Sequence, residues 1–268
     1  MARSRRVVHG AVMAIAAVFV GGCRKSEPEK AAPPSAPPAS APAADPAKTD
    51  APPAAPAGGK GTLAGVVTWG GPAPDKKTVP VTKDHEACGR EVPYQEIVVG
   101  PGGGLANALV SIDGLKPATP YKADAPILFD QKECLFTQRV TVVPVGATLE
   151  VKNSDSILHN THFNSTRNKA ENLAIPAGGS QSVTLSSAEN IKVTCDIHPW
   201  MSAHVVVRDN PYWAVTDGSG RFSIPDVPAG RYKVSVWQES VGKGGAAAVE
   251  VEIRAGAETK QDFTVKPK

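Results

Sequence analysis

The stretch Val140-Thr-Val-Val-Pro-Val-Gly-Ala-Thr-Leu-Glu-Val151 decides the fold class of this chain. Its two halves, residues 140–143 and 148–151, are rich in β-branched and apolar residues, and the Val145-Gly146 turn separates them. No stretch keeps a helical period long enough to compete. Runs of the same kind recur between Gly, Pro, Asn and Asp turns at 63–69, 108–112, 182–185, 192–195, 204–207, 221–224, 231–237, 247–253 and 261–265. We therefore predict an all-β protein built from β-sandwiches.

The N-terminus has the pattern of an export signal. Residues 1–22 begin with three arginines and continue with an apolar run, which is short of the roughly 20 residues that span a bilayer. The run ends at Val-Gly-Gly-Cys23, which resembles the lipobox of bacterial lipoproteins. The resemblance implies that Cys23 is lipidated and becomes the mature N-terminus; an ordinary secretory signal with an incidental cysteine is the alternative. Arg24, which is not an aspartate, implies the outer membrane. We expect an exported chain that is anchored by lipid in the cell envelope, facing the periplasm or the cell surface.

Residues 23–60 are predicted to form a disordered tether. Of the 34 residues from 24 to 57, 12 are Ala and 10 are Pro, and none is Val, Ile, Leu or aromatic. Such a segment cannot build a core and acts as a semi-extended spacer. The net charge of +3 equals the three arginines of the leader, so the mature chain is neutral. This balance gives no electrostatic reason to expect nucleic-acid binding.

The cysteines predict different roles. In an oxidising compartment Cys88 and Cys134 are expected to form a disulfide, since each lies in a polar, turn-rich context. The alternative is a second metal site that these two cysteines share with His85. Cys195 is then left as an unpaired thiol, and a free thiol outside the cytoplasm suggests a use.

Two segments carry metal-ligand chemistry. Cys195-Asp-Ile-His198-Pro-Trp-Met201 holds a thiolate, an imidazole and the only methionine of the mature chain, and His159-Asn160 lies upstream after another β run. Two histidines, a cysteine and a weak axial methionine form the ligand set of a mononuclear type 1 (blue) copper centre. His162 is expected to face away from the metal, because it lies two residues after His159 on a strand. His204 is expected at the surface.

The same segments resemble the cupredoxins, in particular the amicyanin and plastocyanin type, over residues 136–208. The resemblance implies a Greek-key β-sandwich with one copper ion. His159, Cys195 and His198 would be equatorial ligands and Met201 the axial one. Asn160 would hydrogen-bond the backbone near Cys195.

A second resemblance concerns the flanking regions. Gly61-Thr-Leu-Ala-Gly-Val-Val-Thr, Leu105-Ala-Asn-Ala-Leu-Val-Ser-Ile and the segment from Thr216 to Val236 are similar to carboxypeptidase regulatory-like (transthyretin-like) sandwiches. We therefore predict that a copper domain (121–208) is inserted into a small sandwich formed by 61–120 and 209–268. The rival layout is one enlarged cupredoxin followed by a small C-terminal domain.

The predicted function is one-electron transfer by a membrane-tethered copper protein that is not an enzyme and has no small-molecule substrate. The electron would pass through an exposed edge of His198. The resemblance implies a redox partner such as a c-type cytochrome or a periplasmic dehydrogenase. Two alternatives remain: copper binding or delivery, and a structural surface protein that merely retains the fold.

Overall fold

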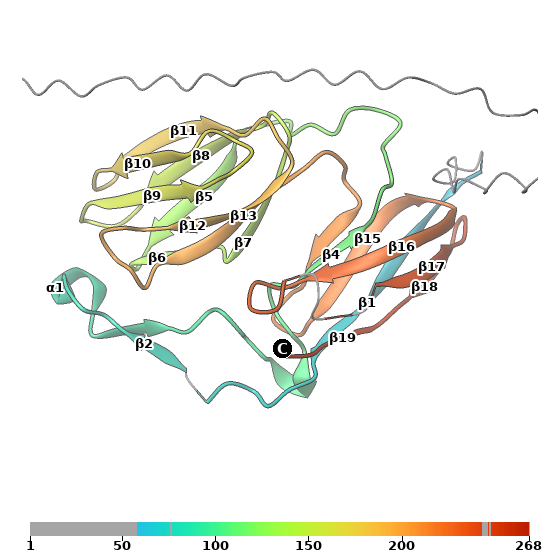
Figure 1. Ribbon diagram of the computed structural model, residues 1–268, viewed down its shortest axis with the longest axis horizontal. Helices are drawn as coiled ribbons and strands as arrows, with labels where there is room; N and C mark the ends of the chain where they lie inside the picture. The colour runs from blue at the N-terminus through green and yellow to red at the C-terminus, as the bar shows by residue number, and fades with distance from the viewer. Residues whose placement is uncertain (1–57, 76, 243–245, 247, 268) are drawn as a thin grey trace, which may run out of the picture. The chain divides into compact units, whose positions relative to one another are not determined.

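The computed structural model describes residues 58–75, 77–242, 246 and 248–267 (Figure 1). The predicted leader, Cys23 and the tether up to residue 57 lie outside the described residues. Within the described part, strands dominate, and helical structure is limited to α1 (His85–Cys88) and the 3-10 turn η1 (Pro101–Gly103). The all-β prediction is confirmed. No helix among these residues is long and apolar enough to cross a membrane.

The middle of the chain forms a two-sheet sandwich, here called the central sandwich. Its sheets have the strand orders β10-β9-β12-β13-β7 and β11-β8-β5-β6. Alternation along the strands places Phe129, Leu149, Phe163 and Val193 in one fully buried core. The strands are β5 (Ile127–Lys132), β6 (Leu135–Phe136), β7 (Val140–Pro144), β8 (Thr148–Asn153), β9 (His159–Asn164), β10 (Glu171–Ile175), β11 (Ser180–Thr184), β12 (Glu189–Thr194) and β13 (Ser202–Arg208).

Strands from both sides of this segment form a second sandwich, here called the terminal sandwich. One sheet has the order β14-β4-β16-β17; in the other, β1 pairs with β15, β18 and β19. Its separate core includes Leu63, Val110, Ile224 and Val234. The strands are β1 (Lys60–Trp69), β4 (Leu109–Ile112), β14 (Trp213–Val215), β15 (Arg221–Pro228), β16 (Gly230–Trp237), β17 (Val249–Ile253), β18 (Glu258–Lys260) and β19 (Phe263–Val265).

Strand β7 is buried along its whole length because it contributes to two clusters. Val143 points into the central core, whereas Val140 and Val142 join Leu109 and Val206 in a small cluster that links the two sandwiches. This explains why residues 140–143 form a continuous apolar run.

One segment departs from the predicted domain boundary. Residues 78–93, which the sequence assigned to the terminal sandwich, form the hairpin strands β2 (Thr78–Pro80) and β3 (Glu91–Pro93) with α1 between them. Val81, Cys88 and Val92 are buried in the core of the central sandwich. The segment packs there because its apolar side chains, and the disulfide of Cys88, attach it to that core.

Candidate metal centre

Two of the expected ligands lie at one end of the central sandwich. His159 is the first residue of β9, and Cys195 directly follows the last residue of β12. The two strands pair antiparallel, with Thr194 opposite His162. The start of β9 and the end of β12 therefore lie side by side, and the pairing brings His159 and Cys195 together.

A tight loop between β12 and β13 adds His198 and Met201. The backbone N–H of Cys195 donates to the carbonyl of Met201 at 3.2 Å, and the N–H of Met201 donates to the carbonyl of His198 at 2.9 Å. The N–H of His198 also donates to Cys195 Sγ at 3.4 Å. These bonds fix the loop, and the Met201 side chain is fully buried at its end.

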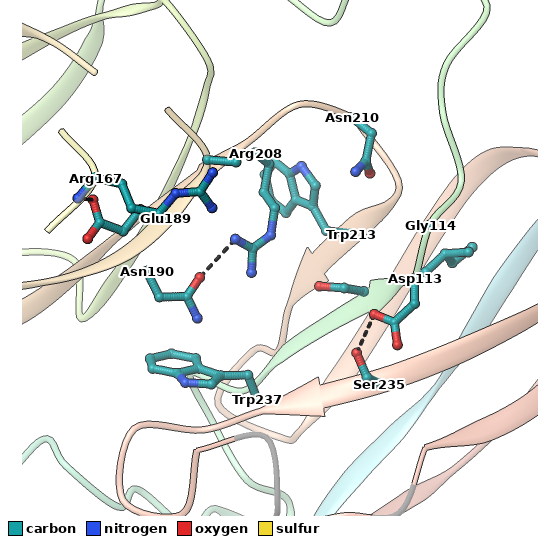
Figure 2. A pocket seen from close by; sticks show the side chains of 13 residues that line it. Asp113, Gly114, Arg167, Glu189, Asn190, Arg208, Asn210, Trp213, Ser235 and Trp237 are labelled. Atoms are coloured by element: carbon teal, nitrogen blue, oxygen red, sulfur yellow. Dashed lines mark hydrogen bonds between the residues drawn. The ribbon is translucent and has the colours of Figure 1, made fainter. Parts of the chain in front are cut away.

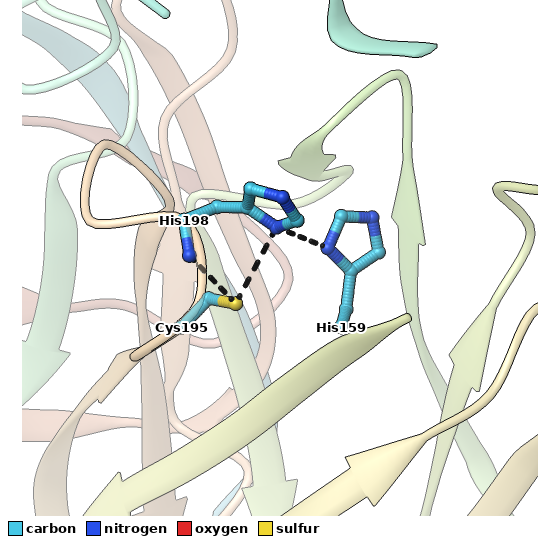
Figure 3. A group of neighbouring side chains, drawn as sticks. All are labelled: His159, Cys195 and His198. Atoms are coloured by element: carbon cyan, nitrogen blue, oxygen red, sulfur yellow. Dashed lines mark hydrogen bonds between the residues drawn. The ribbon is translucent and has the colours of Figure 1, made fainter. Parts of the chain in front are cut away.

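Three ligand atoms converge in this cluster (Figure 3). The Nδ1 atoms of His159 and His198 are 2.8 Å apart, and Nδ1 of His198 is 3.8 Å from Cys195 Sγ. The three atoms all lie within 4.8 Å of one another. Both imidazoles are fully buried and Cys195 is 2% exposed, so these atoms face a dry interior.

The chemistry of this donor set fits copper. Burial, with His198 alongside, lowers the pKa of His159 below its ordinary value, although Asp155 acts in the opposite direction. A lowered pKa keeps the imidazole neutral, which is the form that binds a metal. Two imidazole nitrogens and one cysteine sulfur are the donors that copper prefers in a trigonal His₂Cys arrangement.

Two carboxylates lie beside the Nε2 atoms of the imidazoles, which are the nitrogens that point away from Cys195. Asp155 Oδ2 lies 2.8 Å from Nε2 of His159, and Asp84 Oδ2 lies 2.9 Å from Nε2 of His198. A carboxylate at Nε2 favours the tautomer with the proton on that atom, which leaves the lone pair of Nδ1 for a metal. Both imidazoles are therefore oriented with Nδ1 toward Cys195.

The sequence did not identify either carboxylate. Asp155 lies four residues before His159 in the sequence, so its proximity was a usable local signal. Asp84 is 114 residues from His198 and reaches it through the segment around α1. The predicted cysteine pairing was the only hint that this segment lies near the site.

The expectation of an exposed His198 edge is wrong. The His198 ring is fully buried, because Asp84 covers its Nε2 and the Trp200 ring lies 5.0 Å away, centroid to centroid. Trp200 is half-buried and donates through Nε1 to the carbonyl of Cys134 at 3.1 Å. The aromatic ring beside the site is thus fixed by the turn that contains the disulfide.

Asn160 connects the two ligand segments. Its Oδ1 accepts hydrogen bonds from the N–H groups of Asp196 (2.8 Å) and Ile197 (3.2 Å) and from Cys195 Sγ (3.3 Å). Its Nδ2 donates to Asn172 on β10. The residue after His159 therefore fixes the start of the Cys195 loop.

The predicted disulfide between Cys88 and Cys134 is present. It joins α1 to the turn between β5 and β6. In the same turn, the N–H groups of Glu133 and Cys134 donate to the two oxygens of Asp155, at 2.6 and 2.9 Å. The disulfide therefore lies in one network with both carboxylates. The alternative metal site with His85 is wrong, because its two sulfurs are bonded to each other.

The remaining histidines are outside the cluster. His162 is half-buried and pairs with Asp196, with Nδ1 3.1 Å from Oδ1. His204 is not at the free surface: its side chain is 12% exposed, packs edge-on against Trp237 and lies 3.4 Å from a Glu239 oxygen. Its strand, β13, pairs with the strand that contacts the terminal sandwich, which explains this burial.

Comparison with known proteins gives partial matches. The model of polysaccharide lyase family 4, domain II, matches residues 173–261, a stretch that includes strands of both sandwiches. The resemblance of the terminal sandwich to carboxypeptidase regulatory-like domains therefore receives no support from the family model that matches. Comparison with curated proteins gives no significant match.

Solved structures resemble part of the chain. A Cu-containing nitrite reductase from Thermus scotoductus SA-01 matches 36% of the chain at 21% identity and a TM-score of 0.31. The match spans 27% of that enzyme. An amicyanin variant in the Cu(I) state and another in the oxidised state each match 37% of the chain at 24% identity, over 98% of their own length, with TM-scores of 0.29 and 0.30.

Proposed function

We propose that this chain is a type 1 copper protein that transfers single electrons in the bacterial cell envelope and catalyses no reaction of its own. One observation carries the proposal: two imidazole Nδ1 atoms and one thiol sulfur converge in a buried cluster. His159, Cys195 and His198 would bind the metal in a trigonal set, with Met201 as the weak axial ligand. Bound copper would supply a reversible one-electron couple.

The surrounding residues support such a role because they hold the ligands in place. Asp84 and Asp155 fix the orientation of the two rings, and Asn160 fixes the loop of Cys195. A site whose ligands cannot rearrange keeps a similar geometry in both oxidation states, which lowers the structural cost of gaining or losing an electron. The buried surroundings also exclude water from the thiolate.

Because the His198 ring is buried, the electron would not reach the surface directly through its edge and would need another route. Trp200 is the aromatic ring that lies against His198 and is itself partly exposed. We propose that the redox partner docks over Trp200. A c-type cytochrome or a periplasmic dehydrogenase is the proposed partner, and lipidation of Cys23 with the 23–60 tether would keep the domain at the membrane, the outer membrane by preference.

A second candidate function is copper binding or delivery without electron exchange. The observation that favours it is the complete burial of both imidazoles, with a carboxylate at each outer nitrogen. A ligand set enclosed in this way suits tight retention of the ion. The two functions require the same residues and differ in spectrum and in the rate of electron exchange.

The test is the addition of Cu(II) to the metal-free protein. We expect one copper per chain and an intense visible absorption band from thiolate-to-copper charge transfer. In Cys195→Ser the band should be absent. His162→Gln is the matched control, because His162 lies in the same segment but pairs with Asp196 at the surface, and it should keep the band.

The outcomes separate the proposals. Binding of Cu(I) without a visible band in the Cu(II) form would favour copper binding or delivery. A visible band together with slow electron exchange with cytochrome c would favour the same alternative. Absence of stoichiometric copper binding by the folded protein would contradict both functions and leave a structural role.

A further inference from the structure

A cavity lies away from the metal centre, where the two sandwiches meet (Figure 2). Its volume is about 450 Å³, within the range of roughly 300–1,000 Å³ that small-molecule sites occupy. Strands β12 and β13 of the central sandwich line one side, and strands β4, β14 and β16 of the terminal sandwich line the other. Junctions between domains are common places for ligand sites.

Arg208, the last residue of β13, lines the cavity with a guanidinium on which the charges of Asp113 and Asp209 act without direct contact. Its Nη1 donates to Oδ1 of Asn190 at 2.8 Å and to the carbonyl of Val207 at 3.2 Å, and both acceptors are neutral. Among the described residues no carboxylate forms an ion pair with it. A partly buried guanidinium that is bonded only to neutral oxygens has donors left for an anionic ligand, and a carboxylate matches its fork geometry.

Two tryptophans, Trp213 and Trp237, line the same cavity. The Trp237 ring packs edge-on against His204, with centroids 5.0 Å apart, so its orientation is fixed by a neighbour. Indole rings offer flat apolar surfaces with a polar edge, which suits a ligand that has both apolar faces and polar groups.

The remaining lining is polar and of mixed character. Asn190 and Asn210 supply amide donors and acceptors, and Asp113 accepts a hydrogen bond from the Ser235 hydroxyl at 2.8 Å while it keeps further acceptor capacity. These groups suit the neighbouring hydroxyls of a sugar. Asp113 and Glu189 also bring two negative charges to the cavity wall, which oppose a multiply charged phosphate more strongly than a single carboxylate.

We propose that this cavity binds a saccharide that carries a carboxylate, such as a uronic acid residue. Arg208 pairs with the carboxylate, Trp213 and Trp237 contact the apolar faces of the ring, and Asn190 and Asp113 bind its hydroxyls. The proposal is independent of copper, because none of these residues belongs to the metal centre.

The test uses the metal-free full chain in NMR titrations with three matched sugars. Methyl glucuronide has the carboxylate, its methyl ester is neutral, and methyl glucoside has a hydroxymethyl group instead. We expect the glucuronide to bind about tenfold or more tightly than either neutral sugar, as a hydrogen-bonded charge pair implies. Arg208→Gln should abolish this preference, whereas Arg231→Gln, an exposed arginine on β16 outside the cavity, should retain it. Trp237→Phe should weaken the binding of all three sugars.

Several outcomes would overturn the proposal. These are no binding of the glucuronide, equal affinity for the acid and its ester, tighter binding of a nucleoside monophosphate in the same titration, or an unchanged preference in folded Arg208→Gln. If that variant does not fold, the acid and ester comparison on the unaltered protein decides alone.

Discussion

The two ends of the central sandwich use carboxylates in different ways. At the metal end, where β9 begins and β12 ends, Asp155 and Asp84 each accept one hydrogen bond from an imidazole. At the far end, where β9 ends and β12 begins, Glu189 accepts hydrogen bonds from the backbone or side chains of Ser165, Thr166, Arg167 and Asn168.

The difference shows what makes one end chemically available. At the far end the Glu189 carboxylate accepts the hydrogen bonds that residues 165–168 donate, and these bonds only fix the conformation of the loop. At the metal end each carboxylate lies beside Nε2 of an imidazole, and Asp155 also accepts the N–H groups of Glu133 and Cys134. The Nδ1 atoms of both imidazoles face Cys195. Hydrogen bonding to a carboxylate therefore fixes a loop at one end and orients the Nδ1 atoms of two imidazoles at the other.

Removal of the disulfide should have the largest effect. We expect Cys88→Ser with Cys134→Ser to lower the free energy of unfolding by about 2–5 kcal/mol, because the bond closes a segment of 46 residues. It should also release α1 and Asp84 from the metal end. In a Cys23→Ser background Cys195 is then the one free thiol of the disulfide-bonded protein, and its reaction with a thiol reagent reports access to the site.

Urea unfolding and the labelling rate of Cys195 measure the two effects separately. The double variant introduces no new thiol, so the unaltered disulfide protein in the same background is the direct control. An unchanged labelling rate under conditions where the double variant is folded would show that the disulfide does not keep α1 and Asp84 in place beside His198.

Asp155→Asn should weaken metal binding next most strongly. The change keeps the size of the side chain but removes the charge that orients His159 and accepts the N–H groups of Glu133 and Cys134. Loss of such a partner to a metal-binding histidine costs about 10–100-fold in affinity. Competition with a copper chelator measures the change, and Asp124→Asn, an exposed aspartate before β5, should bind as the unaltered protein does.

Asp84→Asn should have a smaller effect on affinity, about tenfold or less, because the Asp84 side chain is 47% exposed whereas that of Asp155 is 13% exposed. It should instead raise the labelling rate of Cys195 in the metal-free protein. Glu86→Gln, two residues along on α1, is the matched control. A larger loss of affinity in Asp84→Asn than in Asp155→Asn would reverse the proposed roles of the two carboxylates.

These two aspartates also mark how far the sequence could lead. The β runs were predictable because alternation reflects burial, and the disulfide followed from compartment and context. His159, Cys195, His198 and Met201 stood out because few residue types bind copper. Asp84 could not be predicted, because its contact depends on where the segment around α1 packs, and no periodicity encodes a contact 114 residues away. The burial of His198 was missed for the same reason.

Glu189→Gln should have the smallest effect and should leave copper binding unchanged. Burial opposes ionisation of Glu189, but hydrogen bonds from Ser165, Thr166 and Asn168 outweigh it and lower the pKa to about 2, from an ordinary value of 4.5. A lowered carboxyl pKa stabilises the folded state above pH 4.5, and this contribution is lost as the pH falls toward 2. After allowance for solvent screening we expect about 1 kcal/mol. The difference in unfolding free energy between Glu189→Gln and the unaltered protein should therefore be largest near neutral pH and shrink as the medium becomes acidic.

Glu250→Gln, an exposed residue on β17, should show no such difference. A loss of copper affinity in Glu189→Gln would mean that the far end also shapes the ligand set, and the contrast between the two ends would fail.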